Sequence, residues 1–99
     1  MPSFQKRLAT VQRAGNLTVS DLARWFDRPH STLRAWIEEG KQPGGGPIDK
    51  EHAQALLGLL ETLVKQKKGF PVPRLSPRKR IEHIQHIRDK VLPGYLLFF

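Results

Sequence analysis

The chain has 99 residues, a net charge of +8 and no cysteine, which indicates one small basic domain and excludes disulfide scaffolds, thiolate metal sites and cysteine nucleophiles. Its apolar runs are too short to span a bilayer and its N-terminus lacks a signal-peptide core, so we expect a soluble protein without membrane contact. The positive charge favours a polyanion as partner, and nucleic acid is the commonest polyanion.

A first helix is expected between Ser3, which can cap its beginning, and Gly15, which can end it. Phe4, Leu8 and Val11 fall on one face of this helix, because residues three or four positions apart are neighbours on a helical surface. The segment is therefore predicted to bury one side against the rest of the domain.

Two further short helices are expected in residues 18–40. The second helix begins after Thr18, since Thr18 and Asp21 have the spacing of a capping box, and the Asp-Arg-Pro sequence at 27–29 interrupts it. The third helix runs from about His30 to Glu39 and ends before Gly40. The apolar residues expected to face inward are Val19, Leu22, Ala23 and Phe26 on the second helix and Leu33, Trp36 and Ile37 on the third.

The remaining sequence predicts a loop rich in glycine and proline and two more helices. A long helix is expected from a cap at Asp49 to about Lys68. An extended connector follows in residues 70–77, and Ser76 and Pro77 begin a last helix. The apolar face of the long helix covers about 160° and must contact more than one neighbour. Its residues are Ala53, Leu56, Leu57, Leu59, Leu60, Leu63 and Val64, and those of the last helix are Ile81, Ile84, Ile87, Val91 and Leu92.

The predicted fold is therefore all-α. A three-helix unit occupies residues 1–40, the loop occupies 41–47, and a helical C-terminal part with a basic helix and an apolar tail occupies 48–99. The charge is unevenly divided, because residues 1–47 carry +3, residues 48–64 carry −2 and residues 65–99 carry +7. The basic excess is thus concentrated in the last third of the chain.

The pattern L-A-x-x-F-x-x-x-x-x-T-L-x-x-W runs through the second and third expected helices. A small residue at its second position allows a close helix crossing, and its large apolar residues form a wedge that fixes the angle between the helices. The pattern consists of Leu22, Ala23, Phe26, Thr32, Leu33 and Trp36. In these positions residues 18–40 resemble the helix-turn-helix family of DNA-binding modules, which implies an N-terminal helix-turn-helix followed by two further helices.

The turn departs from that family at three positions. The family usually has glycine where Asp27 stands, an aliphatic residue where Arg28 stands, and serine or threonine where Pro29 stands. Aspartate tolerates left-handed backbone angles better than most residues, and proline suits the first turn of a helix. We therefore expect the turn to be kept.

The resemblance implies sequence-specific binding of double-stranded DNA, with the third helix in the major groove. Arg34 is the best candidate for reading a base, because a guanidinium donates two hydrogen bonds to guanine O6 and N7. The other expected base contacts are His30, Ser31 and Ala35. The expected backbone contacts are Thr18, Ser20, Arg24, Arg28, Lys41, Lys79, His83, His86 and Lys90.

The segment between Gly40 and Ile48 carries a weaker resemblance. It lies where excisionase-like and phage terminase small-subunit modules have a wing, although three glycines here favour a loop. The resemblance implies either a small transcriptional regulator or a phage packaging subunit. Either protein would act in the cytoplasm of a bacterial or phage-infected cell, in association with the nucleoid.

The last helix has a strip of basic residues on one face. It consists of Lys79, His83, His86 and Lys90. Contact with DNA backbone, contact with an acidic protein and an ordinary solvated face are the interpretations that the sequence leaves open. The second gives an alternative function, a non-enzymatic adaptor whose basic helix binds an acidic phage or host protein.

The apolar C-terminus predicts self-association. The tail sequence YLLFF is an aggregation liability in water, so we expect it to pack on the long leucine-rich helix or on another subunit. Proteins with one short reading helix commonly form dimers or larger homo-oligomers, because one helix reads few base pairs. The expected interface residues are Leu56, Leu60, Leu63, Leu96, Leu97, Phe98 and Phe99.

We expect neither an enzyme nor a cofactor. The carboxylates lie at helix beginnings or on polar helix faces, where capping and dipole pairing explain them. His83 and His86 have a spacing that permits metal binding, but the neighbouring lysines oppose a cation. No catalytic or metal-ligating residue is therefore predicted.

Overall fold

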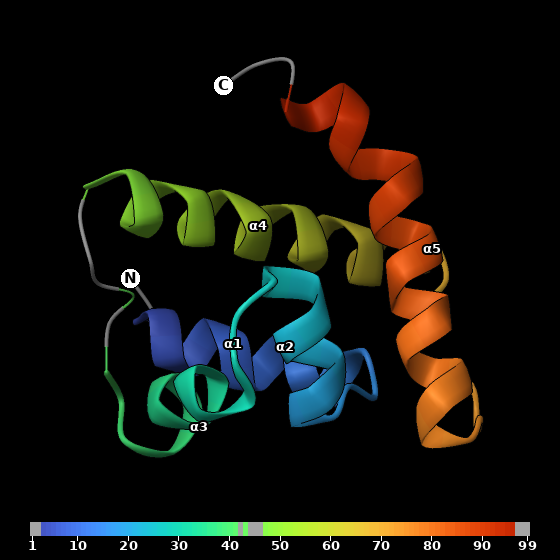
Figure 1. The fold of residues 1–99 in the computed structure, drawn as a ribbon, viewed down its shortest axis with the longest axis horizontal. Coiled ribbons are helices and arrows are strands. Elements are labelled where there is room, and N and C mark those ends of the chain that lie inside the picture. The colour runs from blue at the N-terminus through green and yellow to red at the C-terminus, as the bar shows by residue number, and fades with distance from the viewer. Residues whose placement is uncertain (1–2, 42, 44–46, 97–99) are drawn as a thin grey trace.

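The computed structural model describes residues 3–41, 43 and 47–96, with side chains for 3–41, 43 and 50–92. Helices account for all the regular structure in these ranges, which confirms the predicted all-α class. Figure 1 shows α4 lying above the first three helices and α5 standing beside α2. The five helices are α1 (Phe4–Ala14), α2 (Val19–Phe26), α3 (His30–Glu38), α4 (Pro47–Lys65) and α5 (Pro77–Leu96).

Three helices begin where their capping residues predict. The hydroxyls of Ser3 and Ser76 each accept a hydrogen bond from the backbone N–H three residues further on, at 3.3 and 3.4 Å. At α2 the capping box is complete, because the N–H of Asp21 donates to the Thr18 hydroxyl and the N–H of Thr18 donates to the Asp21 carboxylate, at 3.1 and 2.9 Å. These bonds satisfy N–H groups that have no partner inside the helix.

The turn between α2 and α3 forms as the sequence predicts. Asp27 has left-handed backbone angles, with φ 53° and ψ 50°. This conformation lets the N–H of Arg28 donate to the Ala23 carbonyl at 3.1 Å and the N–H of Asp27 donate to the Arg24 carbonyl at 3.3 Å. Two nested hydrogen bonds of this kind end a helix at its C-terminus and change the direction of the chain. Asp27 therefore adopts the left-handed backbone angles that aspartate tolerates better than most residues.

The predicted helix boundaries need three corrections. α4 begins at Pro47, so Asp49 lies inside its first turn rather than before it. α4 also ends at Lys65 instead of about Lys68, because Lys67 takes a left-handed conformation with φ 56° and stops the helix. α5 continues to Leu96, beyond Leu92, which is the last residue that the apolar pattern assigned to it.

One hydrophobic core joins the N-terminal helices to the C-terminal ones. α4 packs on α1, and α5 packs on α2. The indole N–H of Trp25 donates to the backbone carbonyl of Leu56 at 3.0 Å, which ties α2 to α4. Trp25 is fully buried, although the sequence analysis did not assign it to the core. The two predicted parts of the chain are therefore packed as one unit.

Three aromatic rings hold α3 against α1 and α2. Trp36 lies edge-to-face on Phe4 and on Phe26, with ring centroids 5.5 Å apart in both pairs. Phe4 and Phe26 also meet edge-to-face, at 6.4 Å. Leu22 and Leu33 are buried in the same core, so the predicted wedge between α2 and α3 is confirmed. It fixes the direction in which α3 leaves the turn.

A polar contact fastens α1 to α4 at the surface. Arg7 donates to the Glu61 carboxylate through Nε at 3.2 Å and also through Nη2, and its Nη1 donates to the Gln54 side chain at 3.2 Å. The hydrogen bond to Glu61 raises the pKa of Arg7 above its ordinary value, because it favours the charged guanidinium. The contact supports the position of α4 over the first helix.

None of the helices in the described part of the chain is long and apolar enough to cross a membrane.

Candidate nucleic-acid interface

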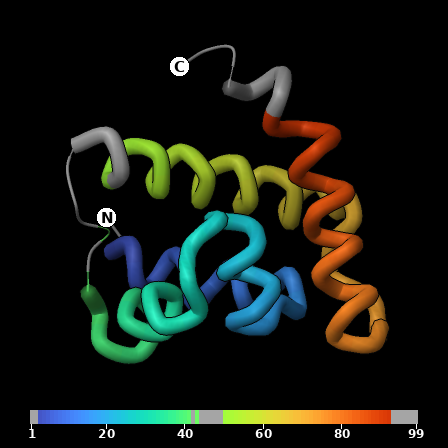
Figure 2. The backbone as a smooth tube through the Cα atoms, viewed as in Figure 1, coloured from blue at the N-terminus to red at the C-terminus, as the bar shows by residue number. Residues whose placement is uncertain are grey.

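α3 has one face in the core and one face in solvent. Leu33 and Trp36 are buried, whereas His30, Ser31 and Arg34 are exposed. The helix packs against α1 and α2, and Figure 2 shows it at the lower left of the molecule, away from α4 and α5. The structure therefore brings three of the four predicted base-contacting residues together on an uncovered surface. The fourth, Ala35, is partly buried beside them.

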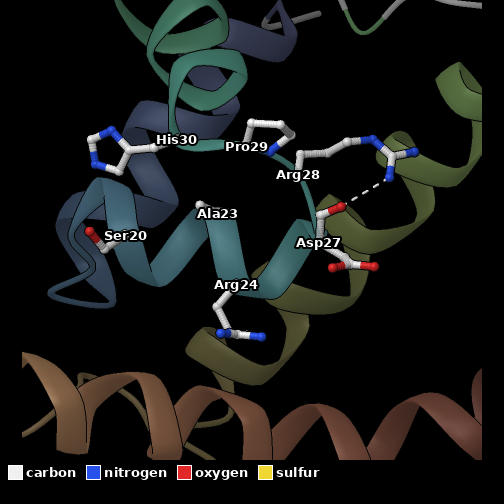
Figure 3. Close-up of a pocket in the computed structure, with 7 residues that line it drawn as sticks. All are labelled: Ser20, Ala23, Arg24, Asp27, Arg28, Pro29 and His30. Atoms are coloured by element: carbon white, nitrogen blue, oxygen red, sulfur yellow. Dashed lines mark hydrogen bonds between the residues drawn. The ribbon is translucent and has the colours of Figure 1, made fainter.

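A concave surface lies where α2 meets the beginning of α3. Its walls are formed by residues 27–30 and by Ser20, Ala23 and Arg24, and it has a volume of about 400 Å³. Figure 3 shows Ser20 and His30 on the same side of this hollow, with the small Ala23 at its base. The hollow therefore lies at the N-terminal end of α3, next to the exposed His30.

The beginning of α3 adds donors to this hollow. Its N-cap residue is Pro29, which makes no side-chain hydrogen bond to the first turn. The N–H groups of His30 and Ser31 therefore have no side-chain cap, whereas the N–H of Thr32 already donates to the Pro29 carbonyl at 3.0 Å. Uncapped amides at a helix N-terminus attract anions such as phosphate. The exposed His30 and Ser31 belong to this same turn.

Two arginines of the hollow point in different directions. Arg24 is exposed and extends toward α5, where it also lines a groove with Ile81 and His86. Arg28 is partly buried and its Nη1 donates to the Asp27 carbonyl at 3.0 Å. The hollow is thus flanked by two cationic side chains.

A buried ion pair fixes the first turn of α5 beside the beginning of α2. Asp21 has an exposed fraction of 1%, and its Oδ2 accepts hydrogen bonds from Arg80 Nε at 3.1 Å and Nη2 at 2.8 Å. The same guanidinium donates to the backbone carbonyls of Asn16 and Pro73. The pair joins residues 59 positions apart. Sequence reasoning assigned Asp21 to capping alone, because no local pattern signals such a distant partner.

The residues of the predicted basic strip on α5 lie in two different surroundings. Lys79 is exposed in the first turn of α5, next to Arg80 and so close to the beginning of α2. His86 and Lys90, further along α5, instead line a groove against the end of α4. The strip is therefore continuous on the helix but faces two different neighbourhoods.

His83 is a correction to the predicted set of DNA contacts. Its Nε2 lies 2.8 Å from the Gly69 carbonyl oxygen, and its ring meets the edge of Phe70. The residue is partly buried because the connector between α4 and α5 folds back on this face of α5. His83 thus contacts the connector rather than facing solvent freely.

The remaining predicted backbone contacts lie at the edges of the three-helix unit. Thr18 and Ser20 are exposed in the first turn of α2, although the Thr18 hydroxyl is engaged in the capping box. Lys41 is exposed just after α3, with Glu39 3.8 Å from its ammonium group. A phosphate contact by Lys41 would therefore compete with a neighbouring carboxylate.

The predicted oligomer interface is wrong for three leucines. Leu56, Leu60 and Leu63 are buried inside the single chain, with exposed fractions of 2%, 0% and 5%. They face the core because α4 packs on α1 and α2, which use the apolar stripe that was assigned to a second subunit. The Leu96 side chain and residues Leu97, Phe98 and Phe99 lie outside the described part of the chain.

No group of three histidine, cysteine, aspartate or glutamate side chains arranged to hold a metal occurs among the described residues. Comparisons with protein-family models, with curated proteins and with solved structures return no match for this chain. The functional interpretation therefore depends on the geometry of the chain itself.

Proposed function

We propose that the chain binds double-stranded DNA, with the N-terminal three helices acting as a helix-turn-helix module. The observation that carries the proposal is the position of α3. It is braced from behind by Leu33 and Trp36, it is left uncovered by α4 and α5, and its outer face carries Arg34. A helix that is supported on one side and presents an arginine on the other fits the major groove, with the exposed Glu38 one turn beyond Arg34.

Each residue of this surface has a distinct role in the proposed complex. Arg34 reads guanine through paired hydrogen bonds, while His30 and Ser31 contact bases or the nearest phosphate. Ala35 contributes a small apolar contact, of the kind made with a thymine methyl. Phosphates on either side are held by the uncapped amides of α3 and by Arg24 and Arg28, and such contacts set position rather than sequence.

The first turn of α5 extends this surface. The Asp21–Arg80 pair places it beside the beginning of α2, and its exposed cations are Arg78 and Lys79. A duplex lying on α3 and on the beginning of α2 passes close to this turn. Lys79 is therefore assigned to the same duplex, and Lys90 is not, because it lies beside the end of α4.

Salt dependence of duplex binding tests the proposal. A duplex selected by the protein from a random library would be titrated at increasing salt concentrations. Five or six phosphate contacts predict that log K falls with log salt with a slope of about −4 to −6, since each contact contributes about −0.9. A flat response, or no binding of any duplex, would reject DNA binding. Lys50→Ala, an exposed position on α4, serves as a control that leaves the slope unchanged.

The proposed biological setting is that of a small transcriptional regulator or a phage DNA-packaging subunit. These two roles can be distinguished by the DNA site that the protein protects and by its oligomeric state. A regulator protects a promoter, whereas a packaging subunit forms a ring and binds a motor protein.

A further inference from the structure

A groove separates the end of α4 from the middle of α5. Its apolar residues are Leu63 on α4 and Ile87 and Val91 on α5, and it has a volume of about 590 Å³. It is larger than the hollow of about 400 Å³ beside α3, and it is lined by apolar side chains where that hollow is mainly polar. A volume of this size accommodates a few side chains of a bound molecule.

Positive charge surrounds the apolar floor. Lys68, just after the end of α4, and Lys90 on α5 line the groove, together with His83 and His86. Lys65 and Lys67, which are both exposed, add charge beside Lys68 at the end of α4. None of these four lysines forms an ion pair with a residue that the structure describes.

The acidic residues of this region are few, and none that the structure describes forms an ion pair with those lysines. Glu82 lies 3.7 Å from Arg78 on the first turns of α5, and Asp89 accepts a hydrogen bond from Gln85 at 2.8 Å. They are the only carboxylates between residue 65 and residue 92. The groove therefore combines an apolar floor with a cationic rim, and no carboxylate is among the described residues that line it.

We propose that this groove binds an acidic amphipathic helix of a partner protein. Such a helix would place apolar side chains, spaced three and four residues apart, against Val91 and against the small exposed parts of Ile87 and Leu63, which are 9% and 5% exposed. Its carboxylates would meet Lys68 and Lys90 at the rim, where charge complementarity favours association and orientation. A DNA backbone fits the rim less well, because sugars and phosphates have no side chains that fill an apolar floor.

The groove and α3 lie at different ends of the molecule. Figure 1 shows α3 at the lower left, whereas the end of α4 meets α5 at the right. The chain would thus hold DNA at one end and an acidic protein at the other. This connecting role depends on the proposed DNA binding, but helix binding in the groove does not.

Fluorescence anisotropy with a designed peptide tests the groove. The probe is a labelled helix of about 18 residues with leucines at i, i+3, i+4 and i+7 and with glutamate and aspartate elsewhere. We expect a Kd of about 10–100 µM at physiological salt, and binding at least about tenfold weaker for a peptide of the same composition without the helical spacing. Equal binding of the two peptides would overturn the proposal.

Two charge-reversal variants of the full chain locate the binding. Lys68→Glu with Lys90→Glu is expected to weaken peptide binding at least about tenfold, because two rim contacts become repulsive. The matched control is Lys6→Glu with Lys50→Glu, which changes the net charge equally at exposed positions on α1 and α4. The control is expected to bind the peptide within about twofold of the unaltered chain, because salt screens distant charges. An equal loss in both variants would overturn the proposal.

The same peptide and the same variants also test two other possible occupants of the groove, DNA and a second copy of the chain. Displacement of the peptide by a short duplex, with weaker duplex binding by the Lys68→Glu, Lys90→Glu variant, would overturn the proposal in favour of DNA. A dimeric mass in solution that becomes monomeric in that variant would overturn it in favour of a second copy. Peptide binding with no duplex binding by the unaltered chain would support the groove while rejecting the proposed DNA-binding function.

Discussion

Removing the guanidinium of Arg80 tests how the C-terminal helix is held on the N-terminal unit. We predict that Arg80→Met strongly destabilises the protein, because methionine keeps most of the apolar stem and removes every hydrogen bond. Asp21 would then keep a buried carboxylate without its cation, since its exposed fraction is 1% and the Arg80 side chain is itself only 12% exposed.

The magnitude follows from burial. Breaking a buried pair by removing one partner costs about 3–5 kcal/mol. Asp21 retains the hydrogen bond from the Thr18 N–H, so we expect a loss near the lower end, about 3 kcal/mol. A chain of 99 residues has a total stability of about 5–15 kcal/mol. The substitution therefore removes a large share of it and lowers Tm by roughly 12–24 °C.

Urea unfolding followed by circular dichroism measures the effect. The matched control is Arg78→Met on the same helix, because the Arg78 side chain is 91% exposed and its pair with Glu82 spans 3.7 Å. An exposed pair of this kind contributes about 0.3–0.5 kcal/mol. Equal losses of stability in Arg80→Met and Arg78→Met would refute the argument that the Asp21–Arg80 pair anchors α5.

Substitutions at two other positions test the left-handed helix ends. Lys67→Gly is expected to raise the free energy of unfolding by about 1 kcal/mol, because glycine adopts φ 56° without the steric cost that a lysine bears; a lower midpoint of urea unfolding would contradict this reasoning. At the turn before α3, Asp27→Val is expected to cost about 1–2 kcal/mol and to weaken duplex binding, whereas Asp27→Gly preserves both. Indistinguishable duplex affinities for the valine and glycine variants would show that the turn does not control the position of α3.

The helix caps and the turn between α2 and α3 could be predicted from the sequence, because they depend on residues that are close together in the chain. The Thr18–Asp21 capping box begins α2 as expected, and Asp27 takes the left-handed angles that the interrupted pattern requires. Capping and turn geometry depend on residues a few positions apart, so a single sequence contains the information. The exposed position of Arg34 follows in the same way from helical periodicity.

Packing between residues that are distant in the sequence could not be predicted in the same way. The apolar stripe of α4 indicates a buried face but does not indicate what covers it, so Leu60 was assigned to a second subunit although the same chain buries it. No local pattern in the sequence predicts a partner for Arg80, and His83 was placed on the basic strip of the last helix, for which three interpretations were left open. Their partners, Asp21 and the Gly69 carbonyl, are brought to them only by the path of the connector and the packing of α5.

The most direct test of DNA recognition by α3 compares base discrimination by the unaltered chain with that of Arg34→Ala and of the control Lys50→Ala. Each protein would be titrated with its selected duplex and with duplexes carrying single base-pair changes. We predict that Arg34→Ala loses about 1–3 kcal/mol of discrimination at one position while the control loses none. Unchanged discrimination by Arg34→Ala at every position would contradict base reading by α3.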